Sequence, residues 1–77
     1  MAQTIHTEAS ILRSGAVVVS YSAGRTFGAV MFDEHGRYSD ATRQTKTTTG
    51  RGFCDMDQLP AGVLDAARTA RRTVVAA

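Results

Sequence analysis

Residues 16–32, AVVVSYSAGRTFGAVMF, decide the fold of this chain. Both ends of the stretch are rich in β-branched and aromatic residues, which favour extended strands. Ala23 and Gly24 interrupt the pattern, and Gly24 can adopt the positive φ angle that a tight hairpin needs. The stretch therefore predicts two antiparallel strands, at residues 16–22 and 26–32, joined by a short hairpin.

Further strands are predicted on both sides of this hairpin. Residues 4–12 alternate along the chain, with Ile5, Thr7, Ala9 and Ile11 on one face. Residues 33–36, DEHG, form a turn signal that ends in glycine. A fourth candidate strand starts at Arg37, and its threonines favour an extended backbone. Few of its side chains are strongly apolar, so residues 37–49 are expected to form an edge strand or, in part, a loop.

The second half of the chain changes to a helical period. Asp55 and Gln58 have the spacing of a capping box, and Pro60 is well placed as a first helical residue. From Pro60 onward the spacing predicts an amphipathic helix. Its inner face would carry Val63, Ala66, Ala67, Ala70 and Val74, and its outer face Asp65, Arg68, Thr69 and Arg72.

These elements predict a single α+β domain over residues 1–77, in which an antiparallel meander of three or four strands packs against one C-terminal helix. One helix can cover only one face of such a sheet. In the strand at residues 26–32, Val30 and Phe32 lie on one face, and Phe27 and Met31 lie on the other. We therefore expect the uncovered face to expose an apolar patch, which is typical of an interaction surface.

Composition narrows the functional classes. The chain has 77 residues, a net charge of +2 and one cysteine, so it cannot form an intrachain disulfide or a cysteine-based zinc site. The lone Cys54 suits a reducing compartment, and neither a signal peptide nor a membrane-spanning run is visible, so we expect a cytoplasmic location. No catalytic or metal-binding motif is present. We expect no enzymatic activity, no cofactor and no metal ion.

The leading hypothesis is a non-enzymatic module that binds another protein through the uncovered face of the sheet. Aromatic and arginine side chains dominate the binding energy of such surfaces. We expect the binding residues to be Tyr21, Phe27 and Met31 as apolar anchors, with Arg25, Arg37 and Arg43 at the rim.

Two alternatives remain open. Direct binding of DNA or RNA would use the acid-free stretch around residues 43–51 and the cationic end of the helix. Its residues would be Arg43, Lys46, Arg51, Arg68, Arg71 and Arg72. Residues 50–53, GRGF, also share a basic-glycine-aromatic run with the RNA-recognition motif, in which aromatic side chains stack on bases. The other alternative is a homodimer in which the uncovered faces pair with each other.

The strands at residues 16–22 and 26–32, with the helix from Pro60, resemble small inhibitor proteins of phages and mobile elements. The nearest in style are the anti-CRISPR proteins that block type I Cascade surveillance complexes. This resemblance implies stoichiometric binding to a Cas subunit and steric block of nucleic-acid binding, and it carries over no functional residue. Some of those proteins imitate DNA with acidic surfaces. Because this chain is mildly basic, we expect it to bind through an apolar, mixed-charge face.

The order of three strands and a helix also resembles the DNA-binding domains at the N-termini of tyrosine integrases, which read the major groove with their sheet. Such domains carry lysine and arginine on their strands. Here residues 16–22 carry none, and Arg25 alone precedes the strand at residues 26–32. Base readout by the sheet is therefore disfavoured.

Overall fold

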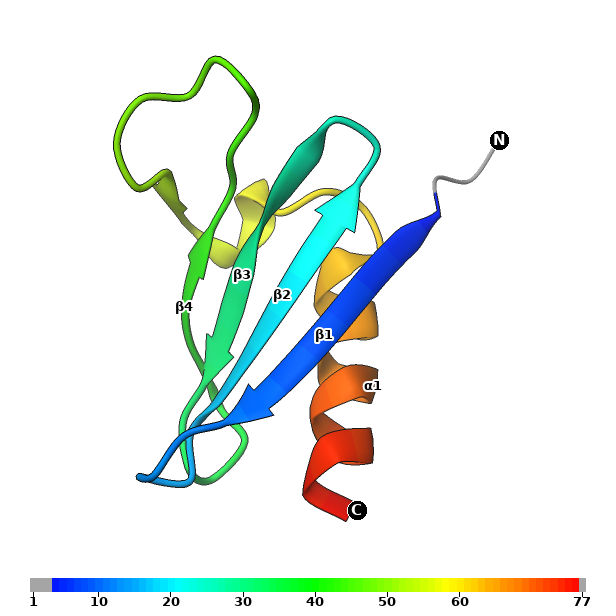
Figure 1. Cartoon of the computed structure of the whole chain (residues 1–77). Helices are drawn as coiled ribbons and strands as arrows, with labels where there is room; N and C mark the ends of the chain where they lie inside the picture. Colours follow the sequence, from blue (N-terminus) through cyan, green and yellow to red (C-terminus); the bar gives the residue numbers. More distant parts are fainter. Residues whose placement is uncertain (1–3, 77) are drawn as a thin grey trace.

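The computed structural model describes residues 4–76, which form an antiparallel sheet and one helix (Figure 1). The strands are β1 (Ile5–Ile11), β2 (Val17–Ala23), β3 (Thr26–Phe32), β4 (Tyr38–Thr42) and β5 (Phe53–Cys54). A short 3-10 helix, η1 (Met56–Gln58), leads into the helix α1 (Val63–Ala76). Within residues 4–76, no helix has both the length and the apolar character needed to cross a membrane.

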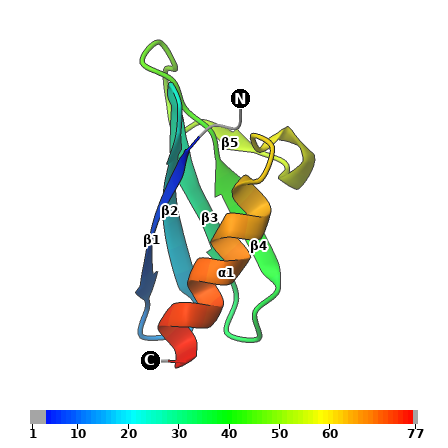
Figure 2. The ribbon, with the colours of Figure 1, turned by 90° about the vertical axis from the view of Figure 1, so that its right-hand side faces the viewer.

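The sheet is a meander in which every strand pairs with its neighbour in sequence, in the order β1-β2-β3-β4-β5. Helix α1 lies on one face and packs mainly against β1 and β2, as Figure 2 shows. The predicted α+β class and the single C-terminal helix are confirmed, and the sheet gains a fifth strand of two residues. We refer to the side that carries α1 as the helix face and to the other side as the open face.

The β2–β3 hairpin sets the register of the central strands. Gly24 has a φ angle of 63°, so the turn closes directly on the pair Ala23 and Thr26. Alternation along the paired strands then puts one side chain in two on the helix face. There they build a core with two residues of α1. Its buried members are Val17, Val19, Tyr21, Ala23, Val30, Phe32, Val63 and Ala67.

Tyr21 belongs to this core, so its expected role as an anchor on the open face is wrong. The hairpin pairs Ser22 with Phe27 and Tyr21 with Gly28, which places Tyr21 and Phe27 on opposite faces. Only 3% of Tyr21 is exposed, and its hydroxyl donates a hydrogen bond of 2.7 Å to the carbonyl oxygen of Thr42. Burial is the main cause that raises the pKa of Tyr21 to about 12.

Gly28 is required where β3 and β4 approach each other. A Cβ atom at Gly28 would overlap the carbonyl oxygen of Thr42, which is the oxygen that receives the Tyr21 hydrogen bond. The missing side chain therefore lets β4 come close enough for Tyr21 to reach it. This contact joins three strands of the sheet through one buried hydroxyl group.

Helix α1 begins later than the sequence predicts. Gly62 has a φ angle of 83°, which is not helical, so Pro60 lies in the preceding turn and the helix starts at Val63. The predicted capping residues act instead on η1, where Gln58 Oε1 accepts a 2.8 Å hydrogen bond from the Asp55 N–H. The predicted inner face is confirmed: Val63 and Ala67 are buried, and Ala66, Ala70 and Val74 are half-buried.

The threonine-rich stretch is part strand and part loop. Strand β4 ends at Thr42, and Gln44 adds one isolated bridge to Phe27. Residues 45–48 then form a turn in which the Thr48 hydroxyl accepts a 2.9 Å hydrogen bond from the Thr45 N–H. Side-chain hydroxyl groups thus supply part of the hydrogen bonding that a strand partner would provide.

Tyr21→Phe should lower the free energy of unfolding by about 1 kcal/mol, because it removes one buried hydrogen bond and leaves the Thr42 carbonyl without that partner. Urea denaturation measures the change. Tyr38→Phe is the matched control: the Tyr38 hydroxyl has no hydrogen-bond partner within residues 4–76, so this substitution should cost much less. Equal losses for the two variants would contradict the proposed contribution of the Thr42 bond.

The raised pKa of Tyr21 predicts a loss of stability in alkali. The folded state favours the neutral phenol, so this contribution is fully present below the ordinary pKa of 10.0 and is lost as the pH rises toward about 12. Urea denaturation at several pH values over this range measures it. Tyr21→Phe should flatten the decline, and an identical decline in both proteins would assign it to other groups.

Candidate interaction surface

The open face carries an apolar stripe on its central strands. Val18 of β2 lies directly across from Met31 of β3, and Phe27 lies further along β3 on the same face. Phe27 is 42% exposed and Met31 is 36% exposed. We use the name apolar stripe for Val18, Phe27 and Met31. Helix α1 does not cover it, because α1 lies on the other face (Figure 2).

The part of the open face on the β1 side of the apolar stripe is polar. On β1 and β2 the outward positions are His6, Glu8, Ser10, Ser20 and Ser22, all of them exposed. Exposed apolar surface is therefore concentrated on β3 and its immediate neighbour Val18. The exposed side chains of β1 and of the rest of β2 on this face are polar. The predicted apolar patch is present, and it is narrower than the whole face.

Phe53 extends the exposed apolar surface toward the far edge of the sheet. Cys54 pairs with the buried Ala41 and so faces the helix side, and alternation along β5 turns Phe53 the other way. Phe53 is 59% exposed, more than Phe27 or Met31. The sequence suggests only a base-stacking role for Phe53. Its position next to the half-buried Cys54 is the sequence signal for this placement.

Two cations lie beside Phe27 at one end of the apolar stripe. A shallow hollow at the β2–β3 hairpin is lined by Gly24, Arg25, Phe27, Thr45, Lys46 and Thr47. Neither Arg25 nor Lys46 forms an ion pair within the described part of the chain. Arg25 therefore lies at the rim, as expected, and Lys46 joins it from the β4–β5 loop. The surface combines an aromatic ring with two unpaired positive charges.

The other predicted rim residues do not complete a ring around the stripe. Arg37 is exposed and follows the β3–β4 turn, at the opposite end of β3 from Arg25. Arg43 lies on the helix side, where its Nη1 donates a 3.4 Å hydrogen bond to the carbonyl oxygen of Gln58. Its charge there lowers the pKa values of Tyr21 and Cys54, against the larger effect of burial. The expected place of Arg43 at the rim of the open face is wrong.

The six cations of the nucleic-acid hypothesis do not form one surface. Lys46 and Arg51 lie in the loop between β4 and β5, at the opposite end of the molecule from the C-terminal part of α1 (Figure 1). The remaining candidates are on α1, apart from Arg43 beside Gln58. A single nucleic-acid strand following the open face would therefore meet only part of this set.

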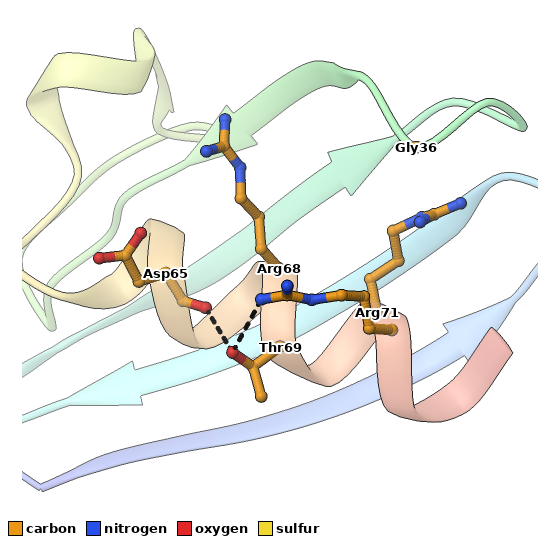
Figure 3. Close-up of a pocket in the computed structure, with 6 residues that line it drawn as sticks. Gly36, Asp65, Arg68, Thr69 and Arg71 are labelled. Carbon is orange, nitrogen blue, oxygen red and sulfur yellow. Dashed lines mark hydrogen bonds between the residues drawn. The ribbon is translucent and has the colours of Figure 1, made fainter. Parts of the chain in front are cut away.

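The helix arginines also diverge from one another. Figure 3 shows the guanidinium groups of Arg68 and Arg71 pointing in different directions, with Arg71 directed toward Gly36. A Cβ atom at Gly36 would lie 2.7 Å from Arg71 Cζ, so this guanidinium packs against the β3–β4 turn. Arg72 instead donates a 3.5 Å hydrogen bond to Thr69 Oγ1. Arg71 therefore acts as a packing residue more than as a free cation.

Cys54 has the environment of a structural thiol. Burial is the largest cause that raises its pKa, and the nearby carboxylates of Asp55 and Asp40 act in the same direction. A raised pKa keeps the thiol protonated, and the protonated form is the poorer nucleophile. Within residues 4–76, no cluster of three or more histidine, cysteine, aspartate or glutamate side chains has the arrangement of a metal site.

No protein-family model, curated protein or solved structure matches this chain. The open face offers an apolar stripe and an additional exposed phenylalanine, with two cations at one end that come from the β2–β3 turn and the β4–β5 loop.

Proposed function

We propose that this protein is a non-enzymatic binding module that docks onto another protein through its open face. The observation that carries the proposal is the apolar stripe: Val18 lies across from Met31, and Phe27 lies four residues from Met31 on the same face, opposite to the face that α1 covers. Contiguous apolar surface of this kind, bordered by polar residues, is typical of protein interfaces.

The side chains of the apolar stripe are suited to this role. Burying exposed apolar surface contributes about 25 cal/mol for each Å² removed from water. A phenylalanine ring is a large contact residue with little conformational freedom to lose, and methionine adapts to irregular partner surfaces. Arg25 and Lys46 at one end favour a partner with acidic groups at the matching position, which would fix the orientation of docking.

The resemblance to anti-CRISPR proteins of phages suggests the target. We place the protein in the cytoplasm, in keeping with its free Cys54 thiol, as a stoichiometric inhibitor of a type I Cascade surveillance complex. The open face would bind a Cas subunit, and the body of the protein would block access of the target nucleic acid. In this proposal the protein needs no cofactor.

The double variant Phe27→Ala/Met31→Ala should bind a purified type I surveillance complex at least about 30-fold more weakly, since truncating an interface hot spot costs about 2 kcal/mol or more. Surface plasmon resonance measures the affinity, and a DNA gel shift of the complex measures the inhibition. Both substitutions remove exposed side chains, so circular dichroism should show an unchanged fold.

The matched control is Ile11→Ala/Val75→Ala, which removes two exposed apolar side chains outside the apolar stripe, 51% and 49% exposed. It should retain both affinity and inhibition. Equal loss in the two double variants would contradict a specific role for the stripe. Absence of binding by the unaltered protein to any type I complex tested would reject the proposed target while leaving the docking face open to a different partner.

A second candidate function rests on the hollow that Phe27 shares with Arg25 and Lys46. Single-stranded nucleic acids are bound by aromatic rings that stack on bases beside cations that contact phosphates. Phe53 on the neighbouring part of the open face would offer a second ring. This arrangement replaces the broader basic surface that the sequence suggested, because the helix arginines are too far away to take part.

If this second function holds, affinity for single-stranded DNA or RNA should fall about sevenfold between about 50 and about 200 mM salt, as expected for two phosphate contacts. A gel shift at the two salt concentrations measures the change. Arg25→Gln/Lys46→Gln should nearly abolish the salt dependence, and Arg68→Gln/Arg72→Gln is the control on α1. No shift at the lower salt concentration would eliminate nucleic-acid binding.

A further inference from the structure

Strand β1 has an unusually complete free edge. It is the outermost strand on its side, and all seven of its residues pair with β2 without a bulge. The opposite edge of the sheet has no comparable length of regular strand. There β5 has only two residues, and β4 contains a register shift opposite Met31 and Phe32. Natural edge strands usually carry proline, lysine or a bulge that prevents pairing with another chain. Strand β1 has none of these features.

The backbone groups that point outward from this edge can be identified. The Leu12 N–H donates a 2.8 Å hydrogen bond to the carbonyl oxygen of Ala16, so Leu12 directs its backbone groups toward β2. In an antiparallel ladder this direction alternates from residue to residue. The N–H and C=O groups of Ile5, Thr7, Ala9 and Ile11 therefore point away from the sheet, where no segment within residues 4–76 pairs with them.

We propose that this edge pairs with β1 of a second copy of the chain, antiparallel and around a two-fold axis at Thr7. In this register Thr7 faces Thr7 of the second copy, and Ile5 faces Ala9 on both sides of the axis. All of these residues have outward backbone groups, so each pair can exchange both ladder hydrogen bonds. The two sheets then form one continuous sheet.

Charge selects this register over its neighbour. With the axis at Thr7, His6 of each copy lies directly across from Glu8 of the other, and an imidazole can donate a hydrogen bond to a carboxylate. Moving the axis by one residue, to Glu8, would place the two Glu8 carboxylates opposite each other, which is destabilising. The side chains of His6 and Glu8 are both exposed on the open face, where they make no hydrogen bond or ion pair within the described residues.

The helix face provides space for the second strand. A shallow hollow beside the β1 edge is lined by Thr7 and Ala9 of β1 and by small side chains of α1, among them Ala66, Ala70 and Thr73. In Figure 1 the C-terminal part of α1 extends past the outer side of β1. An added strand would therefore lie against α1 as well as against β1. Its Ile5 and Ala9 side chains would cover apolar surface in this hollow.

The proposed dimer is compatible with docking through the open face. The two-fold axis is perpendicular to the continuous sheet, so both open faces look in the same direction and both apolar stripes remain free. The dimer would thus present two identical docking surfaces side by side. The pairing of the two β1 edges does not depend on whether a Cas subunit is the protein bound by the open face.

Light scattering on a sizing column tests the pairing directly. The unaltered protein should have twice the mass of one chain, and Thr7→Pro should be monomeric. Proline removes an N–H group that points away from β2, so the β1–β2 ladder and the circular dichroism spectrum should be retained. A monomer at the highest soluble concentration of the unaltered protein would overturn the proposal. A dimer that persists in Thr7→Pro would do the same.

A charge exchange tests the register. His6→Glu places two carboxylates opposite each other, and Glu8→Lys removes the carboxylate that faces His6, so each single variant should dissociate at least several-fold more readily. The double variant His6→Glu/Glu8→Lys restores opposite charges and should recover the dimer. Recovery in the double variant supports the axis at Thr7. Dissociation caused by Phe27→Ala/Met31→Ala, with no effect of the charge variants, would assign the interface to the open face and overturn the proposal.

Discussion

The two-residue turn at Gly24 and Arg25 fixes which side of the sheet each residue of β2 and β3 faces. It closes on the pair Ala23 and Thr26, and every other pairing in these strands follows from that one. A slip of one residue would exchange the two faces, so the core valines would point to solvent. The division of the sheet into a buried helix face and an apolar stripe on the open face depends on this turn.

Much of this architecture could be predicted from the sequence. Alternation and β-branched residues located the strands, and the 3.6-residue period located the inner face of α1. Tyr21 was misplaced because alternation within one strand does not say which residues of two strands share a face. Counting outward from the hairpin would have paired Ser22 with Phe27 and corrected it. The contact among Tyr21, Gly28 and Thr42 has no local sequence signal, because it joins residues from three strands.

The candidate site was predictable to the same extent. Phe27 and Met31 were expected on the open face and are exposed there, and Arg25 lies beside them. Arg43 could not be placed in this way. The register shift between Met31 and Phe32 breaks the alternation of β4, so counting along the chain from the β3–β4 turn gives the wrong face. Likewise, Gly62 delays the start of α1 beyond Pro60, although proline alone is a good helix-starting signal.

The positions of the two tyrosines have a consequence for spectroscopy. The chain contains no tryptophan and only two tyrosines, so its near-ultraviolet fluorescence comes almost entirely from Tyr21 and Tyr38. Both rings contact the core, one fully enclosed and one at its margin. The natural emission of the chain therefore reports on the integrity of its interior, and folding can be followed optically without attaching a dye to the open face.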